Sequence, residues 1–264
     1  MTRRRFIADR WSANSATLTG DQAAHLARVL RASPGQIYDV VAGGYLHRAE
    51  VTSVNADPGR EQVDLLLHEE LEAETSLPLH LLLAIFKFDH LEWGIEKATE
   101  LGVEKITPIL ARRTEKHLQL ASVKRVDRWR RIALEASKQS RRTTVPEIAD
   151  PAQLNPALLS VSSPNRILLS EVEQATPLAT ALQQTRPIQP RVPHSFELHP
   201  DEWAAEPQTS HALAIGPEGG WTPEEMQLFL DHDWQPVTLG PRILRAETAA
   251  VAAVAIASAH LTLA

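Results

Sequence analysis

Residues 211–220 read His-Ala-Leu-Ala-Ile-Gly-Pro-Glu-Gly-Gly, and residues 237–248 read Val-Thr-Leu-Gly-Pro-Arg-Ile-Leu-Arg-Ala-Glu-Thr. Each stretch predicts a strand end that opens into a Gly-Pro loop and then into a helix. The first helix start is well marked, because Thr222 and Glu225 have capping-box spacing and Pro223 suits the first helical position. Ligands of an open α/β sheet bind outside the carboxyl ends of strands, so these two loops are the candidate binding region.

A strand, a helix and a second strand are predicted upstream of these loops. The run Leu79–Phe86 is continuously apolar, as in strands that are buried on both faces of a parallel sheet. Asp89 and Glu92 have capping-box spacing, and Gly102 stands where a helix-ending glycine belongs before the strand Val103–Leu110. This order predicts a right-handed crossover unit. A long basic helix, an edge segment, a short helix and a buried strand are expected at Ser122–Arg141, Val145–Ile148, Pro151–Ser160 and Arg166–Ser170.

Residues 1 to about 70 predict a separate, β-rich module. Thr19 and Gln22 have capping-box spacing for a short helix. Three short runs separated by glycine-containing turns are typical of hairpin strands, namely Gln36–Val41, Tyr45–Val54 and Glu61–Leu67. The acidic stretch 68–76 is interpreted as a linker, and the proline-rich stretch 185–210 as a surface excursion. A small sheet or barrel is therefore expected before a larger α/β domain.

Composition restricts the class of protein. With 264 residues and 43% apolar content, the chain can bury a core for one large domain or two ordinary ones. The absence of cysteine excludes disulfides and cysteine-based zinc sites, and no metal-binding histidine spacing occurs, so no metal is expected. No GxGxxG, P-loop or GxSxG motif occurs either. No apolar run is long enough to span a membrane, and no apolar signal core follows the basic start Met1–Phe6, which favours a cytoplasmic protein.

Positive charge is concentrated in one segment. Residues 105–142 contain twelve Lys or Arg and three acidic residues, a local balance of +9 in a chain whose net charge is −6. Phosphate contacts need local positive potential, so this segment predicts a polyanion site, although a solvated helix face is the alternative. Within it, Glu135, Gln139 and Arg142 would share one face if the helix persists, either as a polar site or as an ordinary exposed face.

Several motifs together span nearly the whole chain. They are the two Gly-Pro loops, Val29-Leu30-Arg31 with Pro34-Gly35-Gln36, Lys97-Ala98-Thr99-Glu100-Leu101-Gly102-Val103, and Glu135-Ala136 with Gln139, Arg142 and Val145-Pro146-Glu147-Ile148. This combination resembles the RsmE-type members of the SPOUT superfamily, which use S-adenosylmethionine to methylate N3 of a uridine in small-subunit ribosomal RNA. Arg141, where relatives commonly have a small residue, and Phe88, where glycine is frequent, depart from the family pattern.

The resemblance implies a fold, a cofactor and partners. The expected fold is an α/β SPOUT-type parallel sheet with a trefoil knot over residues 76–264, preceded by a PUA-like β-barrel, an RNA-binding domain, over residues 1–72. The expected protein is a homodimer that binds S-adenosylmethionine and acts on 16S ribosomal RNA of the 30S subunit. Apolar side chains and main-chain groups of the knot would hold the adenosine, and the implied positions are Leu169, Ser170, Ile215, Gly216, Gly219, Leu239, Gly240, Ile243 and Leu244.

Catalysis and RNA binding need charged residues. Uracil N3 is a poor nucleophile while protonated, so the enzyme must assist its deprotonation or stabilise the anion. Arg245 and Arg142 could offset the anionic charge, while Glu247 could accept a proton, orient an arginine, or simply be a favourable carboxylate in a first helical turn. The sequence does not identify the general base. The RNA-binding residues expected are Arg4, Arg31, Arg112, Arg113, Lys124, Lys138 and Arg141.

Two alternative functions remain open. One is a SPOUT methyltransferase that acts on another nucleotide, for example a ribose 2′-hydroxyl of transfer RNA. The other is a non-catalytic RNA-binding factor built from the N-terminal module and the basic helix. The intact loop motifs at residues 215–220 and 239–248 favour a methyltransferase over this second alternative.

Overall fold

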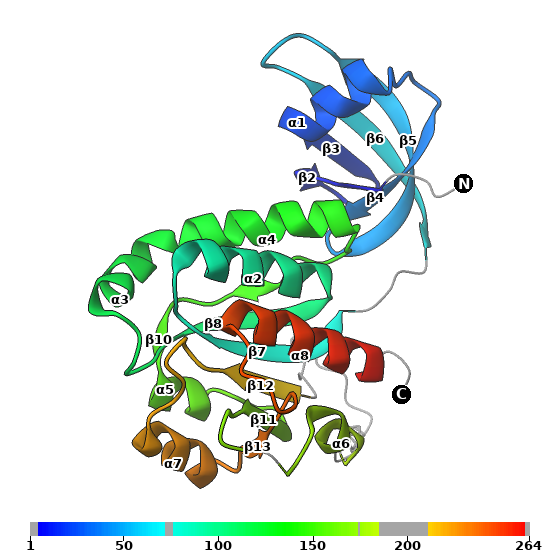
Figure 1. Cartoon of the computed structure of the whole chain (residues 1–264). Helices are drawn as coiled ribbons and strands as arrows, with labels where there is room; N and C mark the ends of the chain where they lie inside the picture. Colours follow the sequence, from blue (N-terminus) through cyan, green and yellow to red (C-terminus); the bar gives the residue numbers. More distant parts are fainter. Residues whose placement is uncertain (1–4, 72–75, 174, 185–210, 262–264) are drawn as a thin grey trace, which may run out of the picture. The chain divides into compact units, whose positions relative to one another are not determined.

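The computed structural model describes residues 5–71, 76–173, 175–184 and 211–261 (Figure 1). The chain separates into two compact units. The N-terminal unit comprises residues 1–75 and 137–144, and the C-terminal unit comprises residues 76–136 and 145–264. Arg4 and the proline-rich stretch 185–210 lie outside the described residues.

The N-terminal unit is built on a mixed six-stranded sheet of order β1-β4-β5-β6-β3-β2 (Figure 1). Only the β1–β4 pair is parallel. The hairpins β4–β5 and β5–β6 were predicted and are confirmed, but β6 continues through Leu71, so residues 68–71 are strand rather than linker. Gly43 and Gly44 form the first turn at φ of 61° and 89°, values that favour glycine. The strands are β1 (Arg5–Ile7), β2 (Arg10–Trp11), β3 (Ser15–Thr19), β4 (Ile37–Ala42), β5 (Tyr45–Asn55) and β6 (Gln62–Leu71).

A short helix, α1 (Gly20–Ala24), and a π-helical turn, η1 (His25–Val29), follow β3. The predicted capping box of Thr19 and Gln22 is wrong. The Thr19 hydroxyl donates to Asp9 Oδ2 at 3.0 Å, while the Gln22 amide accepts from Ile7 N at 3.0 Å and donates to Ile7 O at 2.9 Å. Both side chains therefore fasten the helix to neighbouring segments instead of capping it.

The C-terminal unit contains a parallel sheet of order β10-β8-β7-β12-β11-β13, with β9 also paired to β8. This confirms the predicted α/β class and the strand–helix–strand crossover between residues 77 and 110. The strands are β7 (Leu77–Ala84), β8 (Val103–Leu110), β9 (Glu147–Ile148), β10 (Ala152–Gln153), β11 (Asn165–Leu169), β12 (His211–Ile215) and β13 (Gln235–Val237).

Helices cover both faces of this sheet (Figure 1). Leu81 and Leu83 of β7 belong to the core beneath α2 and α8, whereas Leu82 and Ala84 pack with residues of α5 and α7. Period-two alternation thus places apolar side chains on both faces, which explains the unbroken apolar run in the sequence. The helices are α2 (Phe88–Glu100), α3 (Lys116–Ser122), the 3₁₀ turn η2 (Val123–Arg125), α4 (Val126–Ser140), α5 (Leu154–Leu159), α6 (Leu178–Gln183), α7 (Pro223–Asp231) and α8 (Ala246–Leu261). No helix in the described part of the chain is long and apolar enough to cross a membrane.

The start of α2 differs from its prediction. Lys87 is the N-cap and no side chain caps the helix, so the predicted Asp89–Glu92 box is wrong. The buried Glu92 carboxylate instead accepts from Arg125 at 3.1 Å and Arg128 at 2.8 Å. The Arg125 guanidinium also lies 4.7 Å from the centre of the Phe88 ring. This cation–π contact gives the Phe88 side chain a packing role.

The predicted basic helix ends one residue earlier than expected. Helix α4 stops at Ser140, because Arg141 adopts φ of 63° and Arg142 N donates back to Ser137 O. A residue in this left-handed region closes many helices and is usually glycine. Glu135, Gln139 and Arg142 were expected to share one face if the helix persisted to Arg142, and this condition is not met.

Candidate functional site

A cavity of about 1230 Å³ opens at the carboxyl edge of the parallel sheet. We call it the carboxyl-edge cavity. In the sheet β11 lies between β12 and β13, so the loops that follow these three strands emerge side by side. Open α/β sheets bind ligands at this edge. The lining residues are 169–172, 215–221 and 238–246, together with Lys87, His90, Arg113, Pro223, Met226, Gln227, Leu230 and Ala249.

The structure brings together the residues that the sequence assigned to a cofactor. All nine of those positions line the carboxyl-edge cavity, and so does Arg245. They come from three loops that are separated by as much as 75 residues in sequence, between Leu169 and Leu244.

The loop after β12 passes close to a buried tryptophan. A Cβ atom on Gly216 would lie 3.1 Å from Trp221 Nε1, and Trp221 is itself packed on Phe229 at a ring distance of 4.9 Å. Gly220 has φ of 69°, and Arg113 donates to the main-chain oxygen of Gly219. Glycines therefore let this loop pass close to the indole and to Arg113, where a Cβ atom would make tight contacts.

The predicted capping box at the start of α7 is confirmed. Thr222 Oγ1 accepts from Glu225 N at 3.3 Å, and Glu225 Oε2 accepts from Thr222 N at 2.9 Å, with Pro223 in the first turn. The other oxygen of this buried carboxylate accepts from Arg112 N at 2.8 Å. Glu225 thus fixes the loop after β12 to the segment that follows β8.

The loop after β13 presents apolar side chains and main chain to the cavity. Gly240 has φ of 118°, and its N–H donates to Thr238 Oγ1 at 3.1 Å, which holds the turn. Ile243, which lies between Arg242 and Leu244, is 83% exposed. An exposed isoleucine at a cavity mouth suits contact with a flat apolar ligand group.

Cations predominate among the charged lining residues. The lining includes four basic residues, Lys87, Arg113, Arg242 and Arg245, and two acidic residues, Glu171 and Glu218. Lys87 and His90 were not predicted as site residues. Lys87 follows the carboxyl end of β7, the strand next to β12, so the same strand-end argument applied to the run Leu79–Phe86 would have found it.

The other two predicted catalytic residues do not line the cavity. Glu247 is buried in the first turn of α8, where its Oε1 lies 3.5 Å from His90 Nδ1. Arg142 belongs to the N-terminal unit and follows the end of α4. The structure therefore groups Arg245 with the predicted cofactor residues. It places Glu247 beside His90 but outside the lining of the cavity, and it does not group Arg142 with these residues.

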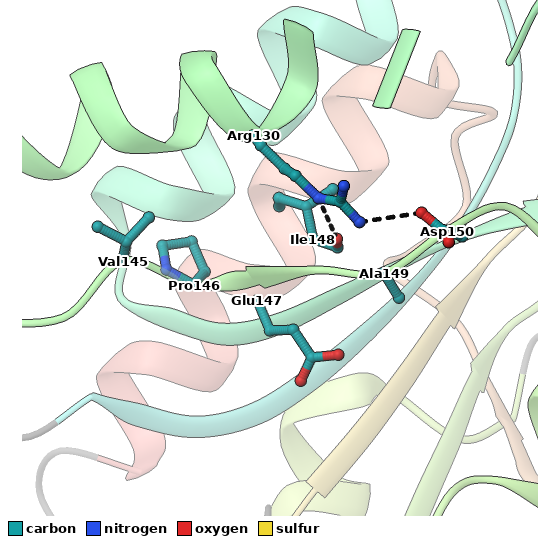
Figure 2. Close-up of a pocket in the computed structure, with 7 residues that line it drawn as sticks. All are labelled: Arg130, Val145, Pro146, Glu147, Ile148, Ala149 and Asp150. Atoms are coloured by element: carbon teal, nitrogen blue, oxygen red, sulfur yellow. Dashed lines mark hydrogen bonds and ion pairs between the residues drawn. The ribbon is translucent and has the colours of Figure 1, made fainter. Parts of the chain in front are cut away.

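A second, smaller hollow of about 480 Å³ lies beside β9 at another part of the same unit (Figure 2). We call it the β9 hollow; Arg130 and residues 145–150 line it. Figure 2 shows the Arg130 guanidinium donating to Ile148 O at 3.2 Å and to Asp150 at 2.9 Å. The cation of the β9 hollow, Arg130, is thus already bonded within the chain. None of the predicted site residues lines this hollow.

Comparison with known proteins identifies the family. A model described as an RNA methyltransferase domain matches residues 73–258. The ribosomal RNA small subunit methyltransferase E of Synechocystis is 33% identical over 247 residues, which cover 93% of this chain and 73% of the relative. The Bacillus subtilis protein of the same name is 30% identical, with 88% of this chain and 85% of the relative covered. The chain belongs to the ribosomal RNA small subunit methyltransferase E family.

Solved structures agree with this assignment. A Neisseria gonorrhoeae ribosomal RNA small subunit methyltransferase E bound to S-adenosyl methionine matches with a TM-score of 0.73 and 28% identity, covering 99% of this chain and 98% of that chain. A putative methyltransferase from Legionella pneumophila in complex with the same cofactor matches with a TM-score of 0.72 and 26% identity, covering 98% of each chain. The family predicted from the motifs is confirmed, and so is the predicted class, an RNA methyltransferase.

The predicted RNA-binding residues of this family member lie in both units. Arg112, Arg113 and Lys124 belong to the C-terminal unit and are exposed, and Arg113 also lines the carboxyl-edge cavity. Arg31 is an exposed residue of the N-terminal unit, which also contains Lys138 and Arg141. Among the described residues no cluster of three or more His, Cys, Asp or Glu has the arrangement of a metal site.

Proposed function

We propose that this family member transfers the methyl group of S-adenosylmethionine to N3 of a uridine in 16S ribosomal RNA of the 30S subunit. The observation that carries the proposal is the convergence of nine motif positions on one cavity at the carboxyl edge of a parallel sheet. Two solved structures that this chain resembles over nearly their whole length hold the same cofactor.

The lining residues fit S-adenosylmethionine. Leu169, Ile215 and Leu239 offer apolar surface for the adenine ring, and Gly216 and Gly240 leave main-chain groups accessible to its polar edge. A cavity of about 1230 Å³ has room for a nucleoside with its amino-acid tail and for part of a target base. When bound, the cofactor supplies an electrophilic methyl group on a sulfonium. The chain must therefore bind the uridine, remove its N3 proton and stabilise the resulting charge.

The cations of the cavity provide the charge stabilisation. Arg245 precedes α8 and is exposed, and its side chain makes no hydrogen bond or ion pair with the rest of the described chain. Its guanidinium can offer two oriented donors to a uridine oxygen or to a phosphate. We assign the uridine anion to Arg245 and the neighbouring RNA phosphates to Arg113 and Arg242. Arg142, in the N-terminal unit, is proposed as a further cation for the bound RNA.

The same proposal includes the family architecture. Residues 76–264 would form the knotted SPOUT domain, and residues 1–72 the PUA-like barrel that helps to bind RNA through Arg31 and its neighbours. The protein would be a cytoplasmic homodimer. Packing inside the monomer already accounts for part of the alanine-rich composition of α8, because Ala246, Ala250, Ala253 and Ala257 are buried in its core. Sedimentation that detects only a 29.2 kDa species at micromolar concentration would contradict the dimer.

The test is a methyl-transfer reaction with labelled S-adenosylmethionine. The substrate is 30S subunits from cells that lack the modification, and the product nucleosides are identified by mass spectrometry. We expect one 3-methyluridine per 16S RNA. A 2′-O-methylated nucleoside would support the transfer-RNA type of chemistry instead, and calorimetry that detects no cofactor binding would support a non-catalytic RNA-binding factor.

A further inference from the structure

A histidine and a carboxylate face each other where α2 packs against α8. His90 lies in the first turn of α2 and lines the carboxyl-edge cavity, and Glu247 lies in the first turn of α8. His90 Nδ1 and Glu247 Oε1 are 3.5 Å apart, a separation within the range of an ion pair but long for a hydrogen bond. Catalytic hydrogen bonds are often long before substrate binds.

Burial distinguishes the two ring nitrogens of His90. His90 Nδ1 is buried, although the side chain as a whole is 35% exposed, so the accessible part of the ring is away from Glu247. The Glu247 side chain is only 11% exposed, and its Oε2 has no hydrogen-bond partner among the described residues. A buried carboxylate without a bonded partner is costly, and a proton on Nδ1 relieves that cost.

The carboxylate therefore determines which ring nitrogen is free. A carboxylate beside Nδ1 holds the hydrogen there and leaves the lone pair on Nε2, and it stabilises the imidazolium that forms when Nε2 takes a second proton. The other charged groups near His90 act weakly or in opposition. Asp89 Oδ2 lies 3.8 Å from Nε2 but its side chain is 78% exposed, whereas Lys87 and Arg245 at the cavity disfavour the imidazolium.

We propose that His90 is the general base that takes the N3 proton of the uridine, and that Glu247 is the residue that positions it, an inference that rests on the proposed uridine methylation. His90 Nε2 accepts the proton from N3, and the N3 electron pair forms the bond to the methyl carbon. The carbon–sulfur bond breaks, and its electron pair stays on sulfur. The imidazolium is held by Glu247 until its proton passes to water. Arg245 stabilises the charge on the uracil oxygen during this step.

The structure offers a matched control. His117 Nδ1 lies 3.3 Å from Glu115 Oε2, a pair of the same chemistry, but both side chains are exposed and neither lines the cavity. The variants to compare are His90→Gln, Glu247→Gln and His117→Gln. Circular dichroism and cofactor calorimetry establish that each variant folds and binds S-adenosylmethionine before any rate is compared.

The first measurement requires neither cofactor nor RNA. NMR of the isotope-labelled ring shows which nitrogen of His90 carries the hydrogen in the wild type and in Glu247→Gln. We expect the hydrogen to lie mainly on Nδ1 in the wild type and its share there to fall when the carboxylate charge is removed, because the partner of one ring nitrogen decides which tautomer forms. A wild type with the hydrogen on Nε2, or an unchanged share in Glu247→Gln, overturns the positioning role of Glu247. If Glu247→Gln does not fold, Glu247→Asp is measured instead, since its shorter side chain lengthens the same contact.

The second measurement is the single-turnover rate of methyl transfer as a function of pH. General-base catalysis contributes roughly 10²–10⁴-fold, so His90→Gln should lose at least about 100-fold near neutral pH, with the loss shrinking at high pH where uracil ionises unaided. His117→Gln should match the wild type. A rate for His90→Gln within about threefold of wild type, with the same pH profile, overturns the assignment. If the wild type itself leaves uridine N3 unmodified, the proposed function fails, and the NMR measurement of the His90 tautomer still decides whether the pair exists.

Discussion

The carboxyl-edge cavity and the β9 hollow differ in what their polar groups already bind. In the β9 hollow the guanidinium of Arg130 donates to a main-chain oxygen and to Asp150 (Figure 2). At the carboxyl-edge cavity Arg245 makes no such contact with the described residues, and Ile243 is open to solvent. The guanidinium of the β9 hollow is therefore used within the chain, where it holds β9 in place. The carboxyl-edge cavity, in contrast, has a guanidinium on Arg245 that is unbonded within the described chain and an exposed apolar side chain on Ile243, and both are available to a ligand.

The largest effect is expected from Arg245→Lys. Lysine keeps the charge but loses the two-donor fork, so we expect turnover to fall by roughly 10²-fold, as for loss of one preorganised electrostatic contact, while cofactor affinity stays nearly unchanged. The paired variant Arg130→Lys, in the β9 hollow, should leave turnover unaffected. Rapid-quench kinetics and calorimetry measure the two quantities. The catalytic assignment fails if Arg245→Lys loses cofactor binding or folding while the bound complex reacts normally.

Two buried histidines of the parallel sheet should make the stability of the protein depend on pH. Burial, reinforced by Lys105, lowers the pKa of His80 to about 4, and burial, reinforced by His260, lowers the pKa of His211 to about 4. Below the ordinary value of 6.5 the unfolded chain binds protons that the folded chain does not, so the free energy of unfolding should fall as pH drops from 6.5 towards 4. The loss is on the order of 2–3 kcal/mol for each histidine at the lower limit.

Urea unfolding of the wild type, His80→Asn and His211→Asn across this range measures that contribution. Each variant should show a flatter dependence on pH than the wild type, whatever its stability at neutral pH. Well above pH 6.5 both histidines are neutral in the folded and in the unfolded chain, so the three curves of unfolding free energy against pH should run parallel there. Equal slopes between pH 4 and 6.5 in all three proteins would show that the two histidines do not carry the effect.

Two glycines allow a comparison between the loop of the cavity and a position in α2 that does not line it. A Cβ at Gly216 would lie 3.1 Å from the Trp221 ring, whereas a Cβ at Gly94, inside α2, would meet Leu83 at an ordinary 3.8 Å. We expect Gly216→Ala to destabilise the protein by about 1–3 kcal/mol through overpacking and to weaken cofactor binding. Gly94→Ala should stabilise it by about 0.5–1 kcal/mol, because alanine is the better helix former. Thermal unfolding with calorimetry decides, and a harmless Gly216→Ala would mean that the loop has room to move.

The smallest expected effect concerns RNA. Arg112 and Lys124 are exposed, and the Arg112 guanidinium lies 3.6 Å from a Glu224 side chain that is itself exposed. If each contacts one phosphate, Arg112→Ala or Lys124→Ala should weaken RNA binding and lower the slope of affinity against salt by about one unit. Filter binding at several salt concentrations measures this slope. An unchanged slope would assign the basic segment to the solvated-face alternative.

Local sequence predicted the cavity better than it predicted the helix starts. Each strand end is followed directly in sequence by its Gly-Pro loop, so local patterns were enough to locate the loops that line the cavity. The predicted capping box of Thr222 and Glu225 also formed. The boxes at Thr19 and Asp89 failed because their side chains found partners elsewhere, such as Ile7 for Gln22 and Arg128 for Glu92. These partners lie 15 and 36 residues away in sequence.

His90 is a residue of the site that local sequence also failed to predict. Its carboxylate partner is Glu247, on a helix near the other end of the chain, and only the packing of α2 on α8 brings the two together. Arg141 marks another limit, because a left-handed residue ended α4 where helical periodicity predicted one more aligned side chain. Local sequence patterns therefore did not predict contacts between distant elements or the backbone angle of a single residue.

Calorimetric titration of S-adenosylmethionine tests the central claim, which is that the carboxyl-edge cavity holds the cofactor. The matched proteins are the wild type, Leu239→Glu at that cavity and Val145→Glu at the β9 hollow, each shown by circular dichroism to be folded. A carboxylate placed against the adenine would be desolvated without a partner, so Leu239→Glu should bind at least about tenfold more weakly. Val145→Glu should bind as the wild type does. Undiminished binding by Leu239→Glu, or a loss confined to Val145→Glu, would contradict the account.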